Sequence, residues 1–174
     1  MESQLISGID NLRLYQVTGF YTSILSAMGN FAEIVYYAPV VWKDAFQVIQ
    51  KNEQLVQYQF TGESLGKIYQ VGVLLNSAVN IVLNFLITYY TAQGSLDALV
   101  KYPNLYMNSL QIVSISAIVG VGFVFFPLFY YLLLTENPSS FTSVFDMFLK
   151  ATLPILLNVP SMGAFMLYTH EMFY

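Results

Sequence analysis

An uncharged stretch of sequence reads IYQVGVLLNSAVNIVLNFLITYYTAQGSL from Ile68 to Leu96, and a second reads YPNLYMNSLQIVSISAIVGVGFVFFPLFYYLLLT from Tyr102 to Thr135. About 20 apolar residues are enough for a helix to cross the roughly 30 Å hydrocarbon layer of a bilayer. Each stretch is long enough for one such helix, and the link between them is too short for a domain. The pair therefore predicts a transmembrane helical hairpin over residues 67–135.

The overall composition also favours a lipid environment. Hydrophobic residues make up 56% of the 174 residues and charged residues 9%, whereas a soluble domain usually has about 25% charged residues. We expect an all-α integral membrane protein with two to three transmembrane helices and further amphipathic helices at the interface. The net charge of −4 and the scattered basic residues argue against nucleic acid as a partner, because phosphate binding needs clustered Lys and Arg.

The N-terminal region, residues 1–66, is less hydrophobic than the hairpin. Its segment 14–38 is either a third span packed against protein or a helix lying at the interface. Small residues recur there every four positions, at Gly19, Ser23 and Ala27. This spacing lets helix backbones approach closely, so we include these residues in a predicted helix-packing interface.

Prolines are expected to interrupt the helices outside the hairpin. Proline lacks an N–H and clashes with the carbonyl four residues earlier, so we expect Pro39 to end or kink the N-terminal helix. Residues 41–61 then form a separate amphipathic helix. In the C-terminal region, residues 136–174, an amphipathic helix precedes an apolar segment that Pro154 and Pro160 should break. That segment is interpreted as a broken span or a re-entrant segment.

Polar and small residues follow one side of the first apolar stretch. They recur every four positions, at Gly72, Asn76, Asn80, Asn84 and Thr88. A four-residue step advances a helix by about 400°, so these positions stay on one side. Amides facing lipid would be costly. The second stretch offers a surface of small residues at Ser114, Ser116, Gly120 and Gly122.

We interpret these positions as helix-packing surfaces, within the chain or against partner subunits. The alternative interpretation is a polar conduit or a ligand site.

Two titratable residues stand apart from the others. Glu33 is a carboxylate within a long apolar stretch, and an acid inside a membrane is a candidate proton relay. Its closeness in sequence to Pro39 and two tyrosines instead favours contact with lipid headgroups. His170 is the only histidine and the chain has no cysteine. We therefore expect no zinc or haem site, no other metal and no cofactor.

The sequence also argues against catalysis. It contains no nucleotide-binding loop, no nucleophile elbow and no histidine-based triad. Acid–base or covalent chemistry needs at least two titratable groups held together. The acids and bases of this chain lie almost entirely in the connections, so we expect a protein that is not an enzyme and has no catalytic residues.

Two functional hypotheses from different classes fit these features. The first is a structural, non-catalytic subunit of a multi-subunit membrane complex. In composition the chain resembles the supernumerary subunits of mitochondrial respiratory complexes and ATP synthases, which are small and rich in aromatic residues. The resemblance implies the mitochondrial inner membrane, with other membrane subunits and phospholipids as partners. The second is a small homo-oligomeric channel or transporter with a path lined by Asn76, Asn80 and Asn84.

The lysines suggest an orientation and two lipid contacts. Positive charge favours residues 41–67 and 136–150 on the cytoplasmic or matrix side of the membrane. Lys67 and Lys150 are then placed to contact anionic lipid headgroups.

Overall fold

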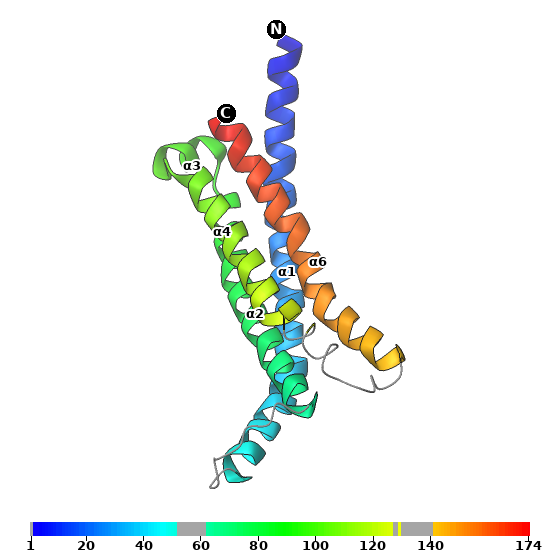
Figure 1. Ribbon diagram of the computed structural model, residues 1–174. Helices are drawn as coiled ribbons and strands as arrows, with labels where there is room; N and C mark the ends of the chain where they lie inside the picture. The colour runs from blue at the N-terminus through cyan, green and yellow to red at the C-terminus, as the bar shows by residue number, and fades with distance from the viewer. Residues whose placement is uncertain (1, 52–61, 127–128, 130–140) are drawn as a thin grey trace.

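The computed structural model describes residues 2–51, 62–126, 129 and 141–174, and for part of these helices it describes the backbone alone. Over these residues the chain is all-helical, which confirms the all-α part of the predicted fold class. The elements in chain order are α1 (Glu2–Lys51), α2 (Gly62–Thr91), α3 (Ser95–Lys101), α4 (Leu105–Gly120), the π-helix η1 (Val121–Phe125) and α6 (Phe141–Phe173) (Figure 1).

The helices form an elongated bundle around α1. Helices α2 and α6 both pack along α1, and α4 packs against α6 and α2. Helix α2 runs antiparallel to α1, and α4 returns beside α2 after the short helix α3 (Figure 1). The N-terminal end of α1 projects beyond the C-terminal end of α6. This arrangement brings the facing sides of α1, α2 and α6 together along the middle of the molecule.

Two helical segments, Gln70–Thr91 and Leu105–Phe125, are long and apolar enough to cross a membrane. They lie within the two uncharged stretches from which the sequence predicts the hairpin. The rest of the molecule buries only 44% of the apolar window of the first segment and 22% of that of the second. Both helices therefore leave apolar side chains at the surface of the bundle, among them Val82 and Phe85 on α2 and Ile118 on α4.

Both helices outside the hairpin continue through their prolines. Helix α1 does not end at Pro39 but runs to Lys51, so the expected end at Pro39 and the separate helix from residue 41 are wrong, while the alternative of a kink at Pro39 stays a prediction. The rest of the expected 41–61 helix, residues 52–61, lies outside the described part of the chain. Helix α6 likewise passes through Pro154 and Pro160, so the C-terminal segment is not broken.

For α6 the physical reason is its packing on α1. A proline inside a helix costs about 3 kcal/mol. Helices α1 and α6 contact each other extensively, and most of the stability of a protein helix comes from tertiary packing of this kind. This packing offsets the local cost of Pro154 and Pro160 in α6.

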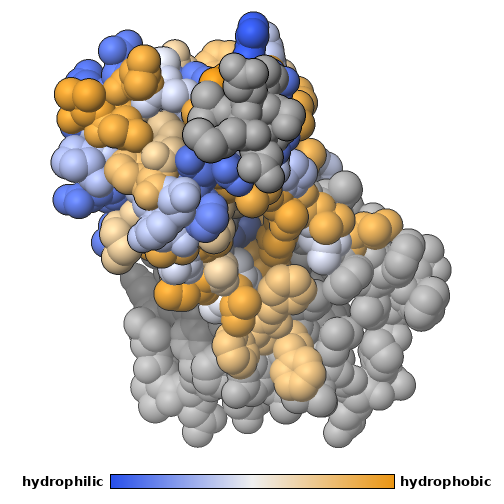
Figure 2. Space-filling view, turned by 90° about the horizontal axis from the view of Figure 1, so that it is seen from above, coloured by the Kyte–Doolittle hydropathy of each residue, from blue (hydrophilic) through white to orange (hydrophobic). Residues whose placement is uncertain are grey.

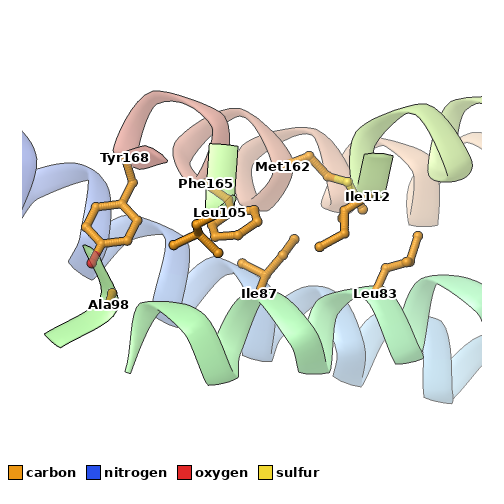
Figure 3. Packing of buried hydrophobic residues seen from close by; sticks show 8 residues of the cluster. All are labelled: Leu83, Ile87, Ala98, Leu105, Ile112, Met162, Phe165 and Tyr168. Carbon is orange, nitrogen blue, oxygen red and sulfur yellow. The ribbon is translucent and has the colours of Figure 1, made fainter. Parts of the chain in front are cut away.

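The hydrophobic core lies at the end of the bundle that carries α3. Its buried members are Leu83, Ile87, Ala98, Leu105, Ile112, Met162, Phe165 and Tyr168 (Figure 3). The ring of Phe165 stacks on that of Tyr90 at a centroid distance of 6.0 Å. This apolar cluster fastens the C-terminal half of α6 to the hairpin and to α3. In the middle of the bundle, many buried positions of α1, α2 and α6 are polar.

Candidate functional site

The buried positions between the helices are largely polar. Those with polar side chains are Ser23, Ser26, Asn30, Asn76, Ser77, Asn80, Asn84, Thr91, Ser109, Asn158, Ser161 and Thr169. We call this set the polar seam. Its members come from α1, α2, α4 and α6, so every long helix of the bundle contributes to it. The seam is the candidate functional site of this chain.

Asn158 of α6 is the centre of the seam. Its side-chain oxygen accepts hydrogen bonds from the Ser26 hydroxyl, from Asn30 Nδ2 at 3.2 Å and from Asn84 Nδ2 at 2.9 Å. These donors lie on α1 and α2, so one amide oxygen joins three helices. A second bond, from the Ser161 hydroxyl to Asn84 Oδ1 at 2.8 Å, fixes α6 against α2. Buried polar groups that are bonded in this way specify how the helices align.

The asparagines of α2 also connect it to α4. The hydroxyl of Ser116 donates to Asn80 Oδ1 at 2.7 Å. Asn80 Nδ2 in turn donates to the backbone and side-chain oxygens of Asn76, both at 2.9 Å. Gly120 is buried beside this pair, since a Cβ added there would lie 3.8 Å from Asn76 Oδ1. Ser114, by contrast, is exposed.

Several polar side chains on α2 also bond to the carbonyl one turn earlier on their own helix. Asn84 Nδ2 donates to the Asn80 carbonyl oxygen at 2.7 Å, and Thr88 donates to that of Asn84 at 2.8 Å. Thr91 donates to the carbonyl of Ile87 at 2.7 Å. Part of the hydrogen-bonding capacity of the seam is therefore satisfied inside α2 itself.

The small residues of α1 lie at its contact with α2 and α6. Gly19 is buried, and a Cβ there would lie 3.2 Å from Thr91 Cγ2 and 3.7 Å from the Phe165 backbone nitrogen. One turn later the hydroxyls of Ser23 and Thr88 are 2.7 Å apart and share a hydrogen bond. Ala27 is half-buried. The structure thus brings Gly19 and Ser23 against α2.

Gly72 allows the closest approach between helices in the bundle. A Cβ at this position would overlap the carbonyl oxygen of Phe123 and lie 2.9 Å from its carbonyl carbon. Phe123 belongs to η1, where the π-helical turn widens the backbone at the end of α4. Only a residue without a side chain fits between α2 and this turn.

Sequence reasoning missed the partners of the asparagines on the other helices. Ser26 and Asn30 continue the polar face of α1, and Asn158 and Ser161 begin that of α6. Their spacing of three or four residues is the signal that would have found them. Because Pro154 and Pro160 indicated a broken segment, the sequence did not predict a polar face on α6.

Gln16 of α1 is a further residue that the sequence pattern did not single out. Its Nε2 donates to the carbonyl oxygens of Thr91 at 2.9 Å and Gln93 at 2.7 Å. The last carbonyls of a helix have no partner within the helix. Gln16 therefore satisfies carbonyls at the end of α2.

Replacing Gln16 with leucine is expected to lower the free energy of unfolding by about 1–2 kcal/mol, because two backbone carbonyls lose their donor. Unfolding of the detergent-solubilised protein by SDS, followed by circular dichroism, measures the change. The matched control is Gln111→Leu on the exposed side of α4, which should leave the midpoint unchanged. Equal effects of the two substitutions would contradict the assigned role.

The remaining predicted positions are placed as follows. Glu33 points toward α2, where the Ser77 hydroxyl donates to its Oε2 at 3.5 Å. This contact turns the Glu33 carboxylate toward the bundle, and its predicted contact with headgroups stays a prediction. The ring of His170 packs against Tyr106 and Tyr174 at the C-terminal end. The side chains of Lys67 and Lys150 lie outside what the structure describes.

The chemistry available in the seam is hydrogen bonding by neutral amides and hydroxyls. Among the described residues there is no group of three or more His, Cys, Asp or Glu side chains that could hold a metal ion. Comparisons with models of protein families, with curated proteins and with solved structures give no match.

Proposed function

We propose that this chain is a non-catalytic structural subunit of a multi-subunit membrane complex. More specifically, we propose an accessory subunit of a respiratory-chain or ATP synthase assembly in the mitochondrial inner membrane. The main support is the polar seam inside the bundle together with the apolar side chains on its exterior. The mitochondrial assignment rests on the composition of the chain alone.

The apolar exterior is most regular on α1. Its exposed large side chains recur at three- or four-residue steps, at Leu14, Val17, Tyr21, Leu25, Met28, Phe31 and Val35. We call this row the α1 stripe. A soluble monomer rarely exposes a contiguous apolar patch of more than about 600 Å². Lipid chains or neighbouring subunits would cover such a surface, and both are available to a subunit inside a membrane assembly.

Aromatic residues at the α3 end fit the headgroup layer of a membrane. The hydroxyls of Tyr89 and Tyr102 are 2.8 Å apart, and Lys101 Nζ lies 5.4 Å from the centre of the Tyr102 ring. The hydrogen bond with Tyr102 raises the pKa of Lys101, so its ammonium group stays charged at neutral pH. Figure 2 shows hydrophilic and hydrophobic residues intermixed at this end. Such amphipathic side chains favour the level where hydrocarbon meets water.

The alternative, a homo-oligomeric channel or transporter, needs the asparagines of α2 to line a path between copies. Asn76, Asn80 and Asn84 are 1%, 1% and 0% exposed within a single chain. Their amides bond to Ser116, Asn158 and Ser161 of the same molecule. Opening a path along them would break these bonds, so the geometry favours the structural subunit.

Purification of the tagged chain from its native membranes tests the proposal. Mild solubilisation followed by native electrophoresis and mass spectrometry should find the chain migrating with several unlike membrane proteins. Subcellular fractionation of the same material tests the mitochondrial assignment separately. Recovery as a homogeneous ring of identical copies would support the channel instead. Extraction by alkaline carbonate without detergent would contradict membrane insertion altogether.

A further inference from the structure

The carboxylate of Glu33 lies well inside the length of the apolar helix beside it. Its hydrogen-bond donor Ser77 is seven residues along from Gln70, the first residue of the apolar segment of α2. At 1.5 Å per residue this is about 10 Å from the start of that segment. Glu33 is therefore held at the level of the seam and not at the end of the helix.

An unpaired hydrogen-bond acceptor lies one helical turn from this carboxylate. Asn30 Oδ1 is buried and has no hydrogen-bond partner. Asn30 precedes Glu33 by three residues, so the two share a face of α1. Asn30 Nδ2 is already used by the Ser26 carbonyl at 2.8 Å and by Asn158. Asn158 Nδ2 is also unpaired and does not bond to Asn30 Oδ1 in this structure.

Within the described part of the chain, no cationic side chain compensates the charge of Glu33. The group that faces it is the Ser77 hydroxyl from α2. Helix α6 passes nearby, where Leu157 packs on Gly29, and its stretch from Ile155 to Asn158 carries no charge. An ionised carboxylate has no hydrogen atom to donate to the unpaired oxygen of Asn30.

We propose that Glu33 is a proton-binding site inside the bundle. The neutral carboxylic acid donates its O–H to Asn30 Oδ1, while its other oxygen accepts the bond from Ser77. A bound proton removes the charge and supplies a donor for the unpaired Asn30 oxygen. A metal cation is a poorer occupant, because Glu33 is the only acidic side chain that the described residues place at this site. The inference does not depend on which complex the chain belongs to.

Labelling with dicyclohexylcarbodiimide tests the proposal on the full-length protein in membranes or mild detergent. This apolar reagent reacts with protonated carboxyl groups: the O–H adds across a C=N bond, and rearrangement gives an N-acylurea that keeps all atoms of both molecules. Peptide mass spectrometry at neutral pH should find one reagent mass on Glu33. The exposed carboxylates Asp97 and Glu171 should remain unlabelled, and Glu33→Gln should lose the label while it keeps the helical fold.

Two further experiments distinguish a bound proton from a metal cation and from an ion pair as the group that neutralises Glu33. Replacing choline with sodium at constant pH should not change the labelling, and suppression by sodium would show that a metal cation occupies the site. Lys150→Gln should also leave labelling unchanged. Labelling that appears only in this variant would reveal an ion pair and overturn the proposal.

Infrared spectroscopy reports the protonation state of Glu33 directly, so it does not require dicyclohexylcarbodiimide to reach this side chain. At neutral pH the protein should show a carboxylic acid C=O band that disappears in Glu33→Gln. The absence of this band in the unsubstituted protein would mean that Glu33 is ionised, whatever the labelling shows.

Discussion

Replacing Gly72 with alanine should destabilise the bundle by about 3 kcal/mol, because the added Cβ would overlap the Phe123 carbonyl. The overlapping group belongs to the backbone of η1, so it cannot turn aside as the end of a flexible side chain would. Helix α2 and the π-helical turn would have to separate. SDS-induced unfolding of the purified protein in detergent, followed by circular dichroism, measures the loss.

The chain supplies a matched control for this substitution. Gly163 lies in α6, and a Cβ added there meets nothing within 4 Å. Alanine is favoured over glycine inside a helix by about 1 kcal/mol, so Gly163→Ala should leave the protein as stable or make it more stable. If both variants unfold at the same SDS concentration, the close approach of α2 to η1 is wrong.

The second large effect is expected at Asn158. In Asn158→Leu the amide oxygen is lost, and the donors on Ser26, Asn30 and Asn84 lose their common acceptor. An unpaired buried donor costs about 1–3 kcal/mol, although measured bonds between membrane helices average nearer 0.6 kcal/mol. With three donors affected, we expect a loss of about 2–4 kcal/mol in the same unfolding measurement.

Two further variants test the reason for this loss. Asn104→Leu changes an exposed asparagine that makes no side-chain capping bond to α4, so stability should be unaffected. Ser26→Ala removes one donor and leaves no group unpaired, so its cost should be about 1 kcal/mol or less. A loss in Ser26→Ala as large as that in Asn158→Leu would show that Asn158 does not join the three helices.

The sequence predicts the hairpin well because the relevant signal is local. A gap in the charges marks each apolar helix, and the four-residue spacing from Gly72 to Asn84 marks the side that faces inward. The same helical geometry separates the two serines of α4. Ser114 and Ser116 are two residues apart, which is about 200° around the helix. They cannot share a face, and only Ser116 reaches Asn80.

The rest could not be predicted because it depends on contacts between distant segments. Proline has a known local cost, and Pro154 and Pro160 therefore indicated a broken segment. The contact of α6 with α1 outweighs that cost, and only then does Asn158 reach the seam. The π-helical turn also has no sequence period of its own. The sequence therefore shows Gly72 only as a small residue on the inward face of α2. Its close contact with the backbone of Phe123 could not be predicted.

The bonds that α2 makes to its own carbonyls have a consequence for the biogenesis of this protein. Insertion into a bilayer takes place one helix or one hairpin at a time, before the final neighbours are in place. Because Asn80, Asn84 and Thr88 each donate to the preceding turn, α2 would enter the proposed membrane with many of its polar hydrogens already engaged. Helix α1 precedes α2 in the chain and α6 follows it, so these internal bonds would protect α2 until α6 is in place.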